Sequence, residues 1–192
     1  MADLGDIWKT TDGGQNWVNI SEALPDTVAI SNIEVDFSNP EVAWVSMKGY
    51  NNNLMFMTTN GGQNWDNISA GLPSVPVNDV VQDNSNANQA ILYAGTDVGV
   101  YKREGGADWT IFSNNLPNVI ANDLEIYYGD VDGDNILRAA TYGRGLWEAP
   151  ISNDQFVENP ENLDAIAGVD NVQINWNLNA SNDTVLLAGS KE

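Results

Sequence analysis

Short runs of β-branched and aromatic residues alternate with Asn, Gly, Pro and Asp over residues 1–150. Each run has the length and the flanking turn residues of a β-strand, and no useful stretch repeats its apolar positions at helical spacing. The sequence therefore predicts an all-β fold. The predicted strands recur in sets of three: Ile33–Phe37, Val42–Val45 and Leu54–Met57; Val77–Val81, Ile91–Ala94 and Val98–Tyr101; Leu124–Tyr128, Leu137–Thr141 and Gly145–Trp147.

A longer repeat connects these sets. A Trp followed eight residues later by Pro occurs three times, at Trp17, Trp65 and Trp109. The Trp residues are 48 residues apart (65 − 17) and then 44 apart (109 − 65). A period in the mid-forties is the length of a four-stranded β-propeller blade. The repeat thus predicts antiparallel four-stranded blades.

The segment before the first two Trp residues resembles the Asp-box hairpin, Ser/Thr-x-Asp-x-Gly-x-Thr-Trp. Residues 10–17 read TTDGGQNW and residues 58–65 read TTNGGQNW, whereas residues 102–109, KREGGADW, are a degenerate copy. In such a hairpin the acid accepts bonds from backbone N–H groups of its own turn, Gly allows positive φ, and Trp packs into the core. We predict structural roles for Thr10, Asp12, Gly14, Trp17, Thr58, Asn60, Gly62 and Trp65.

The Asp-box resemblance implies an architecture and no activity. Asp-boxes occur in sialidases, sortilin-type receptors, xyloglucan-cleaving glycosidases and non-catalytic secreted proteins, on the outer side of the blade and away from the ligand. Residues 139–148, AATYGRGLWE, are similar to the closing segment of Asp-box (BNR-type) propellers in large secreted bacterial multidomain proteins. The resemblance covers about residues 1–150.

Three regions are expected along the chain. Residues 1–150 form an incomplete propeller of about three blades, with thirteen strands, and residues 151–158 form a linker. Residues 159–192 resemble the start of a fibronectin type III domain, a partial β-sandwich with strands at Val172–Trp176 and Val185–Ala188. Three blades cannot close a ring. We therefore expect other blades or domains of a longer parent, or further copies of the chain, to cover the exposed blade faces.

Composition removes several classes of function. The 192-residue chain carries 27 acidic and 7 basic residues, a net charge of -20, which disfavours nucleic acid as a partner. It has no Cys and no His, so disulfides, thiolate metal sites and His-based nucleophile systems are excluded. No apolar run reaches the ~20 residues of a membrane span. Abundant Asn and Gly with few Lys are typical of secreted β-rich proteins, so we expect an extracellular or cell-surface location.

The sequence offers few of the residue sets that sialidases and other glycosidases use for catalysis. A sialidase needs three Arg around its substrate, and the chain offers Arg103, Arg138 and Arg144, two of them in one blade. A two-carboxylate glycosidase could use Asp79 and Asp123, but these recur at one blade position, which is typical of a structural role. We expect a non-catalytic binding or scaffold segment that contacts protein or glycan. The alternative is an accessory or catalytic propeller of a secreted glycoside hydrolase.

Two local features are candidates for ligand binding. Arg144 lies between two Gly residues beside Tyr142, where it could pair with a carboxylate ligand or close the last blade. The loop at Gly129–Asn135 carries Asp130, Asp132 and Asp134 at alternate positions and resembles a calcium loop, although a solvated acidic hairpin tip is the favoured interpretation, since the distal bidentate Glu of an EF-hand is missing. No cofactor other than calcium is expected.

Overall fold

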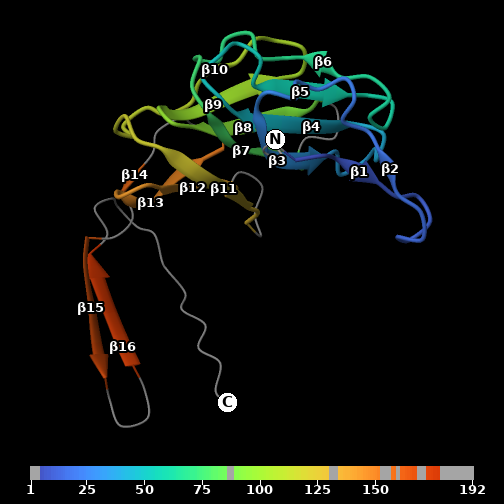
Figure 1. Cartoon of the computed structure of the whole chain (residues 1–192). Helices are drawn as coiled ribbons and strands as arrows, with labels where there is room; N and C mark the ends of the chain where they lie inside the picture. The colour runs from blue at the N-terminus through green and yellow to red at the C-terminus, as the bar shows by residue number, and fades with distance from the viewer. Residues whose placement is uncertain are drawn as a thin grey trace.

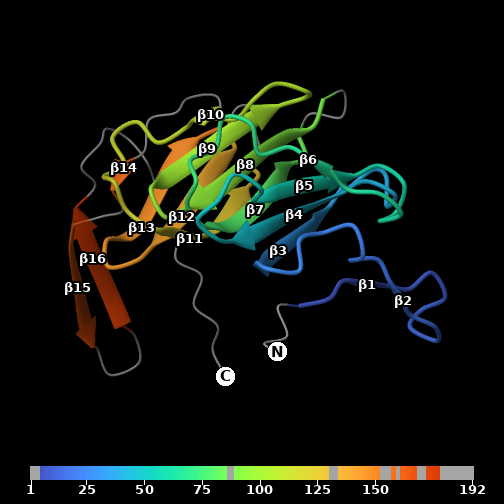
Figure 2. The same ribbon diagram turned by 45° about the horizontal axis from the view of Figure 1, so that its top comes forward.

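The chain folds as a fan of antiparallel sheets, a partial β-propeller, in a computed structural model (Figures 1 and 2). The structure describes residues 5–85, 89–129 and 134–151, together with the backbone of residues 157–158, 161–167 and 172–177. The all-β fold of four-stranded blades predicted from the sequence is confirmed. Each blade consists of consecutive strands that pair with their neighbours in chain order.

Four sheets form the fan. Half-blade 1 contains two strands, and blades 2, 3 and 4 contain four strands each. Half-blade 1 consists of β1 (Trp8–Lys9) and β2 (Val18–Asn19). Blade 2 consists of β3 (Ala29–Val35), β4 (Ala43–Lys48), β5 (Met55–Thr58) and β6 (Asp66–Asn67). Blade 3 consists of β7 (Val77–Asp83), β8 (Ile91–Thr96), β9 (Gly99–Glu104) and β10 (Thr110–Ile111). Blade 4 consists of β11 (Ala121–Tyr127), β12 (Ile136–Thr141), β13 (Gly145–Pro150) and β14 (Val157–Glu158).

β14 corrects the predicted strand count. The two-residue strand pairs with β13 inside the segment predicted to be a linker, and it supplies blade 4 with the fourth strand that the sequence analysis leaves out. The described propeller strands therefore number fourteen. Fourth strands in this chain are two residues long, which is too short to leave a clear run of strand-forming residues in the sequence.

The first strand of each blade contacts the first strand of the next, so β3, β7 and β11 form the inner row of the fan. All three strands have a register irregularity near their start, immediately before Asn32, Asp79 and Asp123. The shared irregularity makes these three positions structurally equivalent, and a bulge re-aims the side chains beside it. Apolar side chains from facing sheets fill two buried clusters between the blades, one around Trp44 and Val80 and the other around Tyr93 and Leu137.

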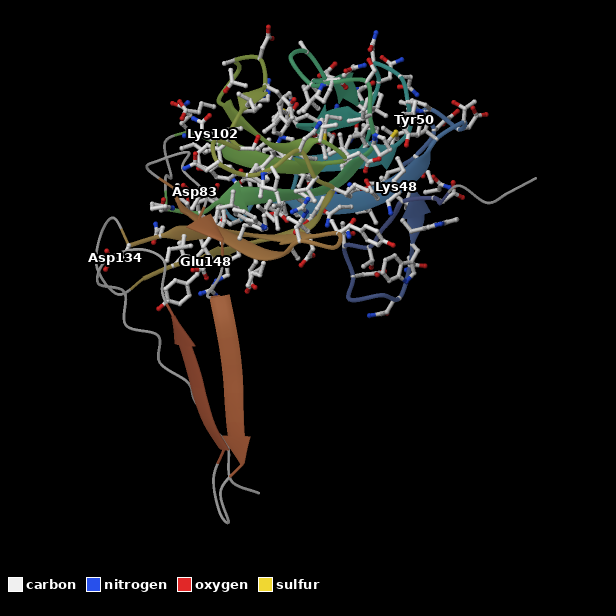
Figure 3. All side chains as sticks on the ribbon, turned by 90° about the vertical axis from the view of Figure 1, so that its left-hand side faces the viewer. Lys48, Tyr50, Asp83, Lys102, Asp134 and Glu148 are labelled. Atoms are coloured by element: carbon white, nitrogen blue, oxygen red, sulfur yellow. The ribbon has the colours of Figure 1, made fainter. Side chains whose placement is uncertain are left out.

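The register also defines two ends of the fan. Ala29 pairs with Lys48, Val77 with Thr96 and Ala121 with Thr141, so the turns between second and third strands lie at one end. We call these turns, residues 49–54, 97–98 and 142–144, the Tyr142 rim. The Asp-box turns, between third and fourth strands, lie at the opposite end. Figure 3 shows Lys48 and Tyr50 at one end and Asp83 and Asp134 at the other.

The C-terminal region contributes a separate antiparallel hairpin, β15 (Glu161–Ala167) and β16 (Val172–Asn177), drawn apart from the blades in Figure 1. β16 covers the strand predicted at Val172–Trp176, whereas Val185–Ala188 lies outside the described residues. The fibronectin type III assignment stays a prediction. Within the described part of the chain, no helix has the length and apolar character needed to cross a bilayer.

Candidate functional site

The first two Asp-boxes are closed hydrogen-bonded turns. In the first, Thr10 Oγ1 donates to Asp12 Oδ1 (2.9 Å) and accepts from Gly14 N (2.9 Å), while Asn16 N donates to Asp12 Oδ1 (2.9 Å). Gly13 and Gly14 have φ of 71° and 90°, a region that Gly occupies without strain. These contacts occupy the polar atoms of the box within its own turn, so the box stabilises the hairpin.

The second Asp-box uses Asn60 in place of the acid. Thr58 Oγ1 donates to Asn60 Oδ1 (3.0 Å) and accepts from Gly62 N (2.9 Å), and Asn64 N donates to Asn60 Oδ1 (3.0 Å). The turn thus has the same three contacts without a charge. The pair of boxes provides a natural comparison between an ionisable and a neutral acceptor at one position.

The ionisable acceptor predicts an acid-sensitive hairpin. Hydrogen bonds from the Asn16 backbone, the Asn16 side chain and Thr10 lower the pKa of Asp12 from 3.8 to about 2. Because the folded pKa lies below the unfolded one, the stabilisation is complete above 3.8 and is lost as pH falls through about 2. We expect the melting temperature of the wild type to fall more between pH 4 and pH 2 than that of Asp12→Asn, which keeps the acceptor oxygen. Equal acid dependence of the two proteins, by circular dichroism, would contradict this role.

The Trp residues of the boxes occupy different environments. Trp65 is 9% exposed and Trp109 is 2% exposed, each packed between its own blade and the preceding one. Trp17 is 54% exposed and donates its Nε1–H to Gly14 O of its own turn (3.1 Å). The prediction that Trp17 packs into the core is therefore wrong. Within the described residues, no sheet precedes half-blade 1 in the way that the preceding sheets bury the other two Trp side chains.

Asp79 and Asp123, the glycosidase candidates, differ in solvent exposure. Asp79 is 4% exposed, and its two oxygens accept backbone N–H groups, Oδ1 from Val80 (2.9 Å) and Oδ2 from Leu124 (2.6 Å). Burial raises the pKa of Asp79, partly offset by these bonds. The carboxylate thus joins blade 3 to blade 4 and has no free oxygen directed at a ligand. Asp123 is exposed on the far face of blade 4.

The three Arg side chains do not converge. Arg103 donates to Gly105 O (2.5 Å) at the Asp-box end, and Arg138 pairs with Glu148 (2.8 Å) in the middle of blade 4. Arg144 is exposed on the Tyr142 rim, at the opposite end from Arg103. An arrangement of three Arg around one carboxylate is therefore absent from the described part of the chain.

The Tyr142 rim brings together side chains from three blades. Tyr50 and Tyr142 are 78% and 73% exposed, more than any other large apolar side chain in the described residues. Tyr50 Oη donates to Asp97 Oδ2 (3.4 Å), and Asn78 Nδ2 donates both to Asp97 Oδ1 (3.0 Å) and to Ala121 O (3.2 Å) of the next blade. The rim thus combines exposed aromatic rings with a hydrogen-bonded polar base.

The turn that carries Tyr142 and Arg144 has an ordered backbone. Thr141 Oγ1 donates to Gly145 O (2.7 Å), Trp147 Nε1 donates to Arg144 O (2.9 Å), and Tyr142 N donates to Ile120 O (2.9 Å). These bonds fix the turn while leaving the Tyr142 and Arg144 side chains exposed. Such a surface can stack on a ligand ring and pair with a carboxylate.

The sequence analysis did not identify two members of this rim. Tyr50 and Asp97 lie in turns of different length, so the repeat alignment does not superpose them on Tyr142. The signal that could have found them is their shared position, after the second strand of a blade. The strand register alone places all such turns at one end.

The acidic loop lies mostly outside the described residues. Asp130 and Asp132 belong to the undescribed segment, and Asp134 is exposed at the Asp-box end (Figure 3). Within the described residues, no group of three acidic side chains is arranged to hold a metal ion. The calcium interpretation stays a prediction.

Comparison with known proteins supports the architecture. The chain resembles the crystal structures of an ancestral GH74 enzyme (18% identity, TM-score 0.58) and of the Niastella koreensis GH74 enzyme (16% identity, TM-score 0.58). The matches cover 81% and 91% of this chain, but the chain spans only 23% and 30% of those enzymes. At this identity the likeness shows the propeller fold alone. No curated protein matches the sequence.

A family model gives the family assignment. The model described as "Photosynthesis system II assembly factor YCF48" matches residues 3–124, from half-blade 1 to the first strand of blade 4. The match covers more than half of the chain and includes both well-formed Asp-boxes. The chain therefore belongs to the photosynthesis system II assembly factor YCF48 family.

Proposed function

We propose that this chain is a non-catalytic binding segment of a larger propeller protein, and that it contacts a protein or glycan ligand through the Tyr142 rim. The observation that carries the proposal is the exposure of Tyr50 and Tyr142 on hydrogen-bonded turns at one end of the fan. Exposed aromatic rings on ordered turns lose little entropy when a ligand stacks on them, and they dominate many binding surfaces. Arg144 adds a positive charge for an anionic group of that ligand.

Two further observations favour binding over catalysis. Both oxygens of Asp79 accept backbone amides in the blade interface, so Asp79 is occupied as a structural acceptor. The family description names an assembly factor, which also supports a binding role. The Asn- and Gly-rich composition, with few Lys, supports an extracellular or cell-surface setting as part of the same proposal.

A glycoside hydrolase is the second candidate, because the two solved structures similar to this chain are GH74 enzymes. Among the three rim turns, only that of blade 3 carries an acidic residue, Asp97. A two-carboxylate mechanism needs a second acid across a cleft. A chain spanning less than a third of those enzymes could share such a cleft with the rest of its parent.

We expect Tyr142→Ala to weaken ligand binding about tenfold to thirtyfold, as loss of an exposed aromatic anchor does. The wild type is screened on arrays of glycans and of cell-surface proteins, and the best ligand is then titrated into each variant. Tyr127→Ala is the matched control, because Tyr127 is 45% exposed on the far face of blade 4. Unchanged affinity in Tyr142→Ala would refute the proposal that the ligand binds at the Tyr142 rim. Turnover of a β-glucan or sialoside that is lost in Asp97→Asn would favour the hydrolase.

A further inference from the structure

The two well-formed Asp-boxes differ at a single position. Residues 58–65, TTNGGQNW, match residues 10–17, TTDGGQNW, except that Asn60 stands where the first box has Asp12. Asn60 is also the only Asn in the 192-residue sequence that is followed by Gly. Because Gly has no side chain, its backbone nitrogen reaches the side chain of a preceding Asn more readily than that of any other residue. Asn60 is therefore the Asn of this chain best suited to deamidation.

Deamidation at this position needs only water. The Gly61 nitrogen bonds to Asn60 Cγ, and its proton leaves with the side-chain nitrogen as ammonia, which forms a cyclic imide. Water then adds its hydroxyl to one of the two ring carbonyls and its proton to the nitrogen that is released. Opening of the ring at one carbonyl gives aspartate, and opening at the other gives isoaspartate, in which the backbone runs through the side chain.

The folded turn engages both reacting groups. Gly61 N donates to Glu41 O (2.8 Å), so its hydrogen points at a carbonyl of the neighbouring strand connection. Asn60 Oδ1 accepts from Thr58 Oγ1 (3.0 Å) and from Asn64 N (3.0 Å). Ring closure therefore has to break the bond to Glu41 and release the Asn60 side chain from its turn.

An ion pair between two sheets covers the same turn. Lys9 Nζ of β1 donates to Glu41 Oε1 (3.0 Å) and Oε2 (3.1 Å) in blade 2. A β-carbon at Gly61 would collide with Lys9 Nζ and Glu41 Oε2, so the pair lies directly on the Gly61 backbone. At Gly13, the equivalent residue of the first box, a β-carbon would meet nothing within 4 Å. The cover over Gly61 thus depends on the docking of half-blade 1 on blade 2.

Two further contacts hold half-blade 1 beside this turn. Trp65 Nε1 donates to Ile20 O (2.8 Å), and a β-carbon at Gly62 would lie 2.5 Å from Ile20 Cδ1. Isoaspartate at position 60 would lengthen the backbone by one atom next to this close approach. We therefore expect isoaspartate to disturb the contact between half-blade 1 and blade 2.

The first box shows how an aspartate product would fit. Asp12 Oδ2 accepts from Asn16 Nδ2 (2.6 Å), a bond that requires an oxygen at this position. Asn60 has its NH2 group there, since its Oδ1 takes the role of Asp12 Oδ1 in accepting the backbone amide four residues later. Replacement of that NH2 group by oxygen would give the Asn64 side chain an acceptor. Aspartate is therefore the product that the folded turn accommodates.

We propose that Asn60 is a gated deamidation site, which stays an amide while half-blade 1 is docked on blade 2 and reacts to aspartate or isoaspartate when half-blade 1 separates. The Lys9–Glu41 pair and the bond from Gly61 N to Glu41 O form the gate. The modification adds one negative charge to the net -20 and leaves a lasting record of the separation. It is independent of any ligand at the Tyr142 rim.

Comparison of the folded and unfolded chain tests the gate. The full chain is incubated at mildly alkaline pH with and without guanidinium chloride, and peptide mass spectrometry follows the exchange of NH2 for OH at Asn60. Electron-transfer fragmentation separates aspartate from isoaspartate. We expect the folded chain to react at least about tenfold more slowly, because local opening must precede ring closure. Equal rates in the two states, or no reaction in the unfolded chain, would overturn the proposal.

Two variants open the gate in different ways. Lys9→Met removes the charge that pairs with Glu41 but keeps most of the aliphatic stem, and we expect it to raise the rate in the folded chain about twofold to fivefold. Ile20→Ala weakens the packing of half-blade 1 and should also raise the rate. Unchanged rates in both variants, with folding verified by circular dichroism, would overturn the proposal.

Lys102→Met is the matched control for the charge. Lys102 forms a partly exposed ion pair with Glu104 in the third Asp-box segment, away from Gly61. We expect this variant to leave the rate at Asn60 unchanged. Equal acceleration by Lys9→Met and Lys102→Met would mean that the rate follows the stability of the whole chain, and it would overturn the gate.

Discussion

Replacing Trp109 with alanine is expected to lower the free energy of unfolding by about 3–5 kcal/mol. Trp109 is 2% exposed and lies in the cluster between blades 2 and 3, where its Nε1–H donates to Ile68 O (2.8 Å). Removing the indole leaves a cavity and an unpaired carbonyl. The cavity lies between two sheets, which can fill it only if a blade shifts. We therefore expect both the cavity and the unpaired carbonyl to lower the free energy of unfolding.

Trp17→Ala is the matched control, since it removes the same residue type from the same Asp-box position. Trp17 is 54% exposed, and its Nε1–H bonds only within its own turn. We expect it to cost about 0.5 kcal/mol or less. Urea unfolding followed by circular dichroism measures both variants. Equal destabilisation would show that Trp17 is buried in solution and that half-blade 1 already has a partner.

Trp109→Phe separates the contribution of ring packing to stability from that of the Nε1–H hydrogen bond at Trp109. Phenylalanine keeps most of the buried ring but loses the indole N–H, so we expect a cost of about 1–2 kcal/mol. A cost as large as that of alanine would assign the stabilisation to the hydrogen bond. A cost near zero would assign it to packing alone.

The repeat made the blades predictable from sequence. A Trp at a blade-length period and β-branched runs between Gly- and Asn-rich turns are local signals, and the strands β7, β8 and β9 overlap the predicted runs closely. β14 was not predictable in this way, because a two-residue strand is defined by pairing with β13 and not by its own residues. The environment of Trp17 was missed for a related reason. Burial of an Asp-box Trp depends on the preceding sheet, which its own motif does not encode.

The candidate site was only partly predictable. Tyr142 and Arg144 were selected from the Gly residues that flank Arg144, a local signal. Tyr50 and Asp97 join them through strand register and through a hydrogen bond between blades, which link positions 47 residues apart. The sequence suggested a structural role for Asp79 from its repetition, and the contact with Leu124 N gives that role a physical basis.

Asp79→Ala is expected to lower the free energy of unfolding by about 2–4 kcal/mol, because it leaves two buried backbone amides, Val80 N and Leu124 N, without an acceptor. Asp123→Ala is the matched control at the equivalent position of blade 4. Asp123 is exposed, so we expect a change of about 0.5 kcal/mol or less.

The same carboxyl predicts a pH dependence of stability. Burial raises the pKa of Asp79 above its usual 3.8, so the folded chain binds a proton more tightly than the unfolded chain at this group. Its contribution to the free energy of unfolding therefore decreases as pH rises from 3.8 through the raised pKa, and is constant above it. The difference between wild type and Asp79→Ala should show this slope in urea titrations over that interval, and the Asp123→Ala difference should not. A pH-independent difference in the free energy of unfolding between wild type and Asp79→Ala would mean that Asp79 is not the buried link between blades 3 and 4. Equal destabilisation by the two variants would mean the same.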